Sequence, residues 1–208
     1  KVKEMYEQNP YPRYRFSDYT YPQLSRPIAE LISNETTLSR LVFSDELLSS
    51  SSSAKVLIAG CGTGNQIINA TRYKDADLTA IDISLSSLAY AIRKSRDYSI
   101  DQVRFEHLDI LNLTDLHKQF DVIECSGVLH HMDNPADGLS ALNRQLKPGG
   151  YMKIGLYSSL ARANINLARN RIRSLGITAS ADNIRAFRKR VFDGDFEELK
   201  KISIFIND

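Results

Sequence analysis

The stretch VLIAGCGTGNQ, Val56–Gln66, decides the fold, because an apolar run there ends abruptly at three glycines on alternate positions. The run is typical of a buried strand, and NQIINATRY (65–73), which begins at the last glycine, has the pattern of a helix. Glycines between a strand and a helix remove the Cβ atoms that would hold a ligand away from the backbone. Tight turns also use glycine, so the loop alone leaves a purely structural interpretation open.

Apolar runs and helical patterns alternate over the next hundred residues. The expected strands are 55–59, 78–82, 103–109, 120–126 and 151–157, and the expected helices are 65–73, 84–98 behind a Ser84 cap, and 136–146, with KPGG (147–150) as a turn. Strands that are apolar nearly throughout, separated by helices, indicate a parallel sheet covered on both faces. The prediction is an α/β, Rossmann-like, doubly wound and mostly parallel sheet in three αβα layers.

Composition limits the class of protein. The chain has 208 residues, a formal net charge of +2 and 42% hydrophobic residues, which suits a globular domain. Cys61 and Cys125 cannot form a disulfide scaffold and no secretory leader is apparent, so a reducing cytoplasm is expected. No apolar segment approaches the roughly 20 residues that span a bilayer, so membrane residence is not expected.

We expect two regions. Residues 1–53 form an N-terminal aromatic arm, a short helix (RPIAELIS, 26–33) and a serine-rich linker, and residues 54–208 form the main domain with a helical insertion at 159–201. Tyrosines and prolines between Tyr6 and Tyr21 disfavour a regular helix and favour an extended segment. After this insertion only KKISIFIND (200–208) remains, which is enough for at most one further strand.

An acid at the end of the second expected strand, about 20 residues after the glycines, is placed to accept hydrogen bonds from both hydroxyls of a ribose. Asp82 holds that position. Strand, glycines, helix, strand and acid in this order indicate a ribose-containing cofactor. The dinucleotide fingerprint needs a third small residue where Asn65 stands. A nucleoside with an amino-acid tail therefore fits better than a dinucleotide.

The motifs VLIAGCGTGNQ, LTAIDIS, HLDIL, FDVIECSGVLHHM and LKPGGYMKIGLY resemble, in order and spacing, those of class I S-adenosylmethionine-dependent methyltransferases. More narrowly, YEQNPYPRY, ECSGVLHHM and GLYSSLAR resemble methyltransferase domains that bacteria attach to tetratricopeptide-repeat segments, although no such repeat is present in this sequence. The resemblance implies S-adenosylmethionine as cofactor, S-adenosylhomocysteine as product, and a methyl acceptor that is an unidentified small molecule or protein side chain. It also implies two further strands at the C-terminal end of the sheet, so we expect these strands to be truncated in this sequence.

Carried over by position, the resemblance implies a cofactor site. The glycine loop would line the methionine part, Asp82 the ribose and Ile83 the adenine ring. The adenine amino group would bind at Asp109 with Ile110 beside it, and Ser126 and Gly127 at the end of the fourth strand would border the methyl group. Asp109 could instead cap a turn, Ile83 could be core, and the strand end could be only a tight turn. The full set is Gly60, Cys61, Gly62, Thr63, Gly64, Asp82, Ile83, Asp109, Ile110, Ser126 and Gly127.

A sulfonium methyl group is already activated, so its transfer depends mainly on alignment in a water-poor site. His130 and His131 follow the fourth expected strand and are the candidate bases for an acceptor that must lose a proton. The alternative is a histidine pair that only shapes the loop. No metal site is expected, because His130, His131 and Asp133 lie on one loop and do not make a closed ligand set.

The aromatic arm is a candidate lid. Tyr6, Tyr11, Arg13 and Tyr14 are placed to pack over the methionine end of the cofactor and exclude water, with Arg13 as a candidate partner for its carboxylate. The alternative is that the arm packs on a neighbouring surface or on an upstream domain.

The C-terminal region is rich in arginine. A basic stripe can follow a phosphate backbone, but because the overall charge is near neutral we interpret it as a solvated helix face that helps select the acceptor. The basic residues are Arg162, Arg169, Arg171, Arg173, Arg185, Arg188, Lys189 and Arg190.

Two other functions stay as alternatives to methyl transfer. The first is a nicotinamide-dependent oxidoreductase, which Asn65 disfavours. The second is a non-catalytic module that binds the cofactor.

Overall fold

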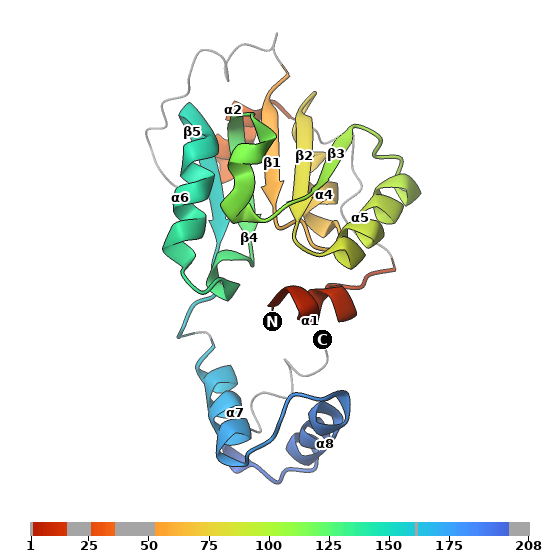
Figure 1. Ribbon diagram of the computed structural model, residues 1–208, viewed down its shortest axis with the longest axis vertical. Coiled ribbons are helices and arrows are strands. Elements are labelled where there is room, and N and C mark those ends of the chain that lie inside the picture. Colours follow the sequence, from red (N-terminus) through yellow and green to blue (C-terminus); the bar gives the residue numbers. More distant parts are fainter. Residues whose placement is uncertain (1, 16–25, 36–52, 161, 200–208) are drawn as a thin grey trace. The chain divides into compact units, whose positions relative to one another are not determined.

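Five parallel strands form one sheet in the order β3-β2-β1-β4-β5, as the computed structural model shows (Figure 1). The chain runs outward from β1 to β3, then returns to the other side of β1 for β4 and β5. The predicted doubly wound fold is confirmed, and its switch point lies between β1 and β4. The strands are β1 (Lys55–Ala59), β2 (Asp77–Asp82), β3 (Val103–His107), β4 (Phe120–Ser126) and β5 (Leu146–Gly155).

The structure describes residues 2–15, 26–35, 53–160 and 162–199. Most of the predicted serine linker and the segment KKISIFIND therefore lie outside the described residues. Contacts within the chain divide it into two units, residues 1–156 and 157–208. Over the part of the chain that is described, no helix is both long enough and apolar enough to cross a bilayer.

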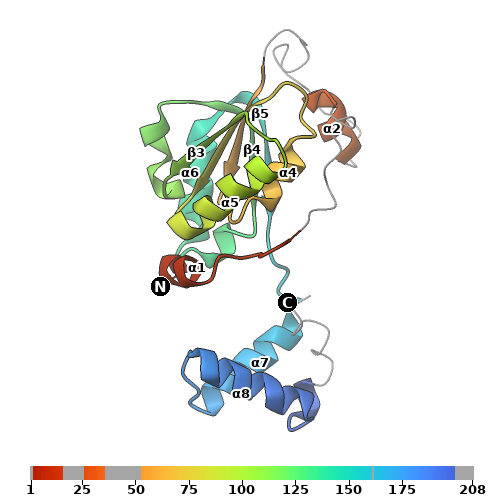
Figure 2. The same ribbon diagram turned by 90° about the vertical axis from the view of Figure 1, so that its right-hand side faces the viewer.

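Helices cover both faces of the sheet (Figures 1 and 2). Successive residues of β1 point to opposite faces, so Val56 and Ile58 join one core cluster while Leu57 and Ala59 join the other. The first cluster is covered by α2 (Ile28–Glu35), α4 (Asn65–Ala70) and α5 (Leu85–Asp97), and the second by α6 (Pro135–Gln145) and the 3₁₀ helices η2 (Ile110–Leu116) and η3 (Leu129–His131).

Strand β5 begins earlier than the sequence pattern indicates. The expected turn KPGG lies inside it, as a bulge between Leu146, which pairs with Phe120, and Tyr151, which pairs with Val122. The bulge is held by Lys147, whose Nζ lies 2.7 Å from a carboxylate oxygen of Asp121. The prediction of a turn at 147–150 was therefore wrong, because these residues form a bulge inside the strand.

The arm is partly helical, which corrects the expectation of an extended segment from Tyr6 onward. Helix α1 spans Val2–Gln8. Proline disfavours the helical conformation of the residue before it, so Pro10 restricts Asn9 but leaves the preceding turns free to be helical. The short helix α2 (Ile28–Glu35) is present as predicted and buries Ile28 against the sheet.

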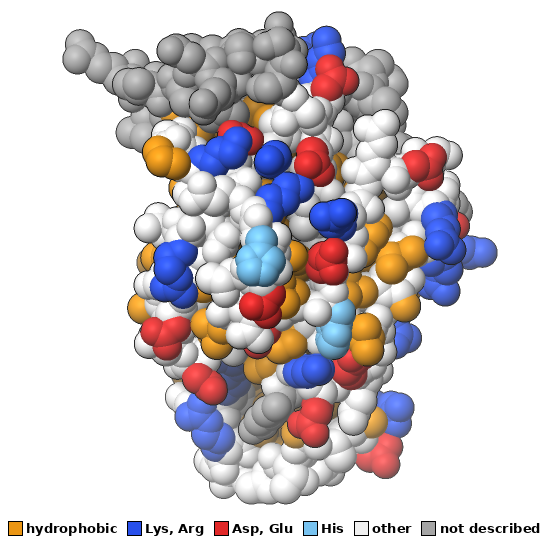
Figure 3. Space-filling view, turned by 45° about the horizontal axis from the view of Figure 1, so that its top comes forward, with side chains coloured by type: hydrophobic (Ala, Val, Ile, Leu, Met, Phe, Trp, Pro, Cys, Tyr) orange, Lys and Arg blue, Asp and Glu red, His pale blue; other side chains and the backbone are white. Residues whose placement is uncertain are grey.

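The second unit contains two helices, α7 (Ala163–Ser174) and α8 (Ala181–Phe192). The hydroxyl of Ser180 accepts a hydrogen bond from the N–H of Asn183 and caps the start of α8. The unit has a small core around Phe196, whose ring is flanked by the guanidinium groups of Arg171 and Arg190. On the face of the protein seen in Figure 3, basic and acidic side chains are interspersed.

Candidate functional site

The glycine loop joins β1 to α4 and is closely packed by the rest of the protein. A Cβ on Gly60 would lie 2.4 Å from Cγ2 of Val128, and one on Gly62 would lie 3.2 Å from the carbonyl oxygen of Tyr11. Both residues have positive φ, 74° and 53°, which side chains disfavour. Val128, which follows β4, therefore packs against Gly60, and the arm residue Tyr11 lies against Gly62.

Asp82 ends β2 and connects it to the loop. Its two carboxylate oxygens accept hydrogen bonds from the N–H groups of Gly62 (2.8 Å) and Ser84 (2.9 Å). The side chain is 8% exposed, and burial raises its pKa while the hydrogen bonds from Ser84, Gly62 and Ile83 lower it. A carboxylate has about four acceptor sites, so with three hydrogen bonds made, Asp82 keeps about one site for a further donor.

The end of β3 lies beside Asp82, because Asp82 pairs with His107 and its carbonyl accepts from the N–H of Leu108. Asp109 caps η2 by accepting a 2.9 Å hydrogen bond from the N–H of Leu111, so the capping interpretation of this residue holds. Ile83 is partly exposed rather than core, whereas Ile110 is buried in the second core cluster. Among these adenine candidates, Ile83 and Asp109 are therefore accessible.

The end of β4 lies directly beside the loop. Ser126 is the last residue of β4 and its carbonyl accepts a 2.9 Å hydrogen bond from Nε2 of Gln66 in α4. Gly127 follows with φ of 77° and donates its N–H to the carbonyl of Gly155. Gln66 was missed by the sequence analysis, although its place directly after the glycine loop was a usable signal.

The two histidines lie in η3, just after β4. Their ring centroids are 4.3 Å apart. The ring centroid of His131 lies 6.3 Å from that of Tyr6, and the two rings are in a T-shaped arrangement. Both ring nitrogens of His130 are buried. The structure thus brings His130, His131 and the arm together at the β4 end of the sheet. Within the described ranges, no group of three or more His, Cys, Asp or Glu is arranged to hold a metal ion.

The arm contacts the glycine loop and α5. The Tyr14 hydroxyl donates to the carbonyl of Thr63 at 3.1 Å, and the Thr63 hydroxyl donates to the carbonyl of Pro12. The Tyr90 hydroxyl donates to the carbonyl of Tyr14 at 2.7 Å, and burial raises the pKa of Tyr14. Of the four predicted lid residues, Tyr6 and Tyr14 place their side chains against the main domain, whereas Tyr11 and Arg13 are exposed.

Glu7 is a second residue that the sequence analysis missed. Its carboxylate accepts hydrogen bonds from the N–H groups of Leu85 and Ser86, each at 2.8 Å, and from the Ser84 hydroxyl at 3.2 Å. Hydrogen bonding to the side chain of Ser86, together with these bonds, lowers the pKa of Glu7 from its ordinary value of 4.5 to about 2. An acid in the arm facing the first turn of a helix is electrostatically favoured, but the sequence does not show that the two segments meet.

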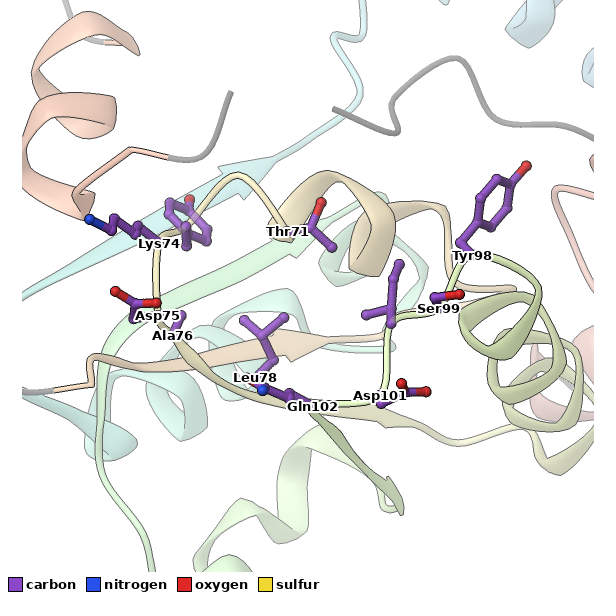
Figure 4. A pocket seen from close by; sticks show the side chains of 11 residues that line it. Thr71, Lys74, Asp75, Ala76, Leu78, Tyr98, Ser99, Asp101 and Gln102 are labelled. Carbon is purple, nitrogen blue, oxygen red and sulfur yellow. The ribbon is translucent and has the colours of Figure 1, made fainter. Parts of the chain in front are cut away.

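A hollow of about 340 Å³ lies at the amino ends of the strands, opposite the glycine loop (Figure 4). It is lined by the connection from α4 to β2, including Lys74 and Asp75, and by the connection from α5 to β3, including Tyr98 and Gln102. These connections lie at the amino ends of β2 and β3. The hollow is therefore separate from the site at the carboxyl ends.

The residues at the carboxyl ends fit S-adenosylmethionine. Asp82 offers acceptor sites for a ribose, and Asp109 lies beyond it after the neighbouring strand. The buried Oε1 of Gln66 has no hydrogen-bond partner among the described residues, and it lies on the side of the loop nearest β4. The polar groups thus follow one line across β3, β2, β1 and β4, which suits a nucleoside with an amino-acid tail.

Comparisons with known proteins agree. Residues 50–174 match the family model described as a methyltransferase domain. Over 113 residues the chain is 40% identical to an uncharacterized protein of Synechococcus sp., covering 53% of this chain and 27% of that protein. Over 98 residues it is 35% identical to the ubiquinone biosynthesis O-methyltransferase of Psychrobacter arcticus, covering 46% of this chain and 38% of that protein. The chain thus spans about a third of the length of these relatives.

A solved structure shows the same fold with the reaction product of such enzymes bound. PKMT2 from Rickettsia typhi in complex with AdoHcy aligns with a TM-score of 0.59 and 26% identity, over 88% of this chain and 34% of that one. With the family match, the five-stranded parallel sheet and the glycine loop, this chain belongs to the methyltransferase domain family and has the class I fold.

Proposed function

We propose that the protein transfers the methyl group of S-adenosylmethionine to a nucleophile held at the carboxyl end of β4. The observation that carries this proposal is the hydrogen bond between Asp82 and the N–H of Gly62, which joins the ribose-binding acid to the glycine loop in one site. When bound, the cofactor supplies an electrophilic methyl group. The protein's task is then to align the acceptor and to exclude water.

In this proposal Gly60, Cys61, Gly62, Thr63 and Gly64 hold the methionine part, and Asp82, Ile83 and Asp109 hold the adenosine. Ile110, which follows Asp109, supports this end of the site from the second core cluster. Ser126 and Gly127 border the methyl group. His130 or His131 takes a proton from an acceptor that needs to lose one, and the position of both rings just after β4 supports this. The O-methyltransferase name of one relative makes a hydroxyl the first acceptor class to test.

The arm completes the site as a lid. Tyr14 and Pro12 are hydrogen-bonded to Thr63 of the glycine loop, and Tyr6 lies against His131, so both ends of the arm meet proposed site residues. Such contacts exclude water from the methionine end. The exposed residues Tyr11 and Arg13 would turn inward over the cofactor.

We place the longer protein in a reducing cytoplasm, with a tetratricopeptide-type region upstream as in the domains that its motifs resemble. The two buried free cysteines, Cys61 and Cys125, support the first statement. Nucleic acid is not the proposed partner, because the formal net charge of the chain is only +2, close to neutral.

Calorimetric titration tests the cofactor assignment. Purified protein should bind S-adenosylmethionine and S-adenosylhomocysteine but not NADH, and Asp82→Ala should lose this binding. Asp101→Ala is the matched control, because Asp101 is an exposed acid at the amino ends of the strands. Binding of NADH alone would overturn the proposal. Binding of the sulfur nucleosides without methyl transfer to any hydroxyl, amine or thiol acceptor would favour a non-catalytic module.

A further inference from the structure

Gln66 is held in one orientation beside the glycine loop. It is the second residue of α4, and its Nε2 donates a 2.9 Å hydrogen bond to the carbonyl of Ser126 at the end of β4. A carbonyl oxygen only accepts hydrogen bonds, so the amide must turn its nitrogen toward Ser126. The Oε1 atom of Gln66 is thereby directed away from that carbonyl.

This Oε1 atom is buried and has no hydrogen-bond partner among the residues that the structure describes. A buried acceptor left without a donor is destabilising, and each such group in a folded protein calls for a partner, such as a water, an ion or a ligand, or for a functional role. The neighbours of Gln66 show in which part of the site a partner of Oε1 would lie. Ser126, which Gln66 contacts, is followed by Gly127 and Val128, and Val128 packs on Gly60. Gln66 therefore lies where the loop and the end of β4 converge.

We propose that Oε1 of Gln66 accepts a hydrogen bond from the α-ammonium group of the cofactor, and that Gln66 makes the site selective for a nucleoside that carries an amino acid. This inference rests on the proposed function. Asp82 and Asp109 lie beyond the loop on β2 and after β3, where they serve the ribose hydroxyls and the adenine amino group. The ammonium group is the remaining donor of the cofactor, and its charge strengthens the bond.

The test compares two ligands that differ only in the ammonium group. S-adenosylhomocysteine and its desamino analogue are titrated into the unaltered protein, into Gln66→Leu and into Asn69→Leu, which changes an amide of the same helix one turn away. We expect Gln66→Leu to bind S-adenosylhomocysteine about 10- to 100-fold more weakly and to bind the desamino analogue as the unaltered protein does. Asn69→Leu should bind both ligands normally.

Equal weakening of both ligands by Gln66→Leu would overturn the inference, because it would show that Gln66 only supports the end of β4. Unchanged binding of both would overturn it as well. If the variant fails to fold, the side-chain ¹⁵N resonance of Gln66 in the unaltered protein decides: it should shift with S-adenosylhomocysteine and not with the analogue. Failure of the unaltered protein to bind S-adenosylhomocysteine at all would instead overturn the proposed function.

Discussion

The carboxylate of Glu7 accepts a 2.8 Å hydrogen bond from the backbone N–H of Ser86, a residue 79 positions further along the chain. The Ser84 hydroxyl donates to the same carboxylate, and the Ser84 N–H donates to Asp82. One short segment therefore connects the arm to the acid that we assign to the ribose. Through this segment, attachment of the arm and the geometry of the cofactor site are coupled.

Glu7→Gln should loosen the arm without unfolding the sheet. The substitution removes a negative charge from the first turn of α5 and leaves a single oxygen to accept two N–H groups. Hydrogen exchange should become several-fold faster for the amides of α1 and of Ser86, with the strand amides unchanged. Glu4→Gln removes the same charge from α1 and should leave the Ser86 amide as it was. Equal exchange in both variants would contradict this role for Glu7.

The arm should also detach in acid. The pKa of Glu7 is lowered from 4.5 to about 2 in the folded protein. A depressed pKa means that Glu7 contributes fully above pH 4.5 and that its contribution is lost as the pH falls toward about 2. Limited proteolysis with an acid-active protease should therefore release α1 increasingly through this interval, before the sheet unfolds. In Glu7→Gln the release should no longer depend on pH in that interval.

Two glycines with positive φ should respond differently to alanine. A Cβ on Gly62 would lie 3.2 Å from the Tyr11 carbonyl, whereas a Cβ on Gly127 would have no atom within 4 Å. Each substitution should cost about 1–2 kcal/mol of unfolding free energy for the left-handed backbone alone. Only Gly62→Ala should also displace the arm, seen as faster exchange of its amides. If Gly127→Ala loosened the arm equally, direct contact would not be the cause.

The sequence predicted the sheet well because its strands are marked by local signals. The apolar run 55–59 and the run 120–126 match β1 and β4 at both ends, and Ser84 caps α5 as expected. Each of these boundaries depends on neighbouring residues alone. The start of β5 was misplaced because it is held by a distant contact, the ion pair of Lys147 with Asp121.

The site was predicted only in part, because some of its residues are marked by local signals and others depend on distant contacts. The glycine loop and Asp82 have fixed spacing within one strand-helix-strand unit, so the sequence shows both. Glu7 and Gln66 act across long separations, 79 residues to Ser86 and 60 to Ser126. Only the folded chain brings Glu7 to the first turn of α5 and the side chain of Gln66 to the carbonyl of Ser126.

Cofactor affinity should depend on pH through Asp82. Burial raises the pKa of this carboxyl, and its ionised form is the better acceptor for ribose hydroxyls. Affinity for S-adenosylhomocysteine should therefore begin to fall, on acidification, at a pH above the ordinary value of about 3.9 for aspartate. Asp82→Asn should bind S-adenosylhomocysteine about 10- to 100-fold more weakly at neutral pH. Its affinity should not change over the pH range in which the affinity of the unaltered protein falls.

Calorimetry between pH 4 and 8 would separate Asp82 from the arm. The lowered pKa of Glu7 keeps it ionised over most of this range, so arm release contributes little there. If the affinity of Glu7→Gln still fell on acidification and that of Asp82→Asn did not, the titrating group would be Asp82. If the affinity of Asp82→Asn fell as well, the pH dependence would belong to another group, and the ribose contact would be left to backbone atoms of the loop.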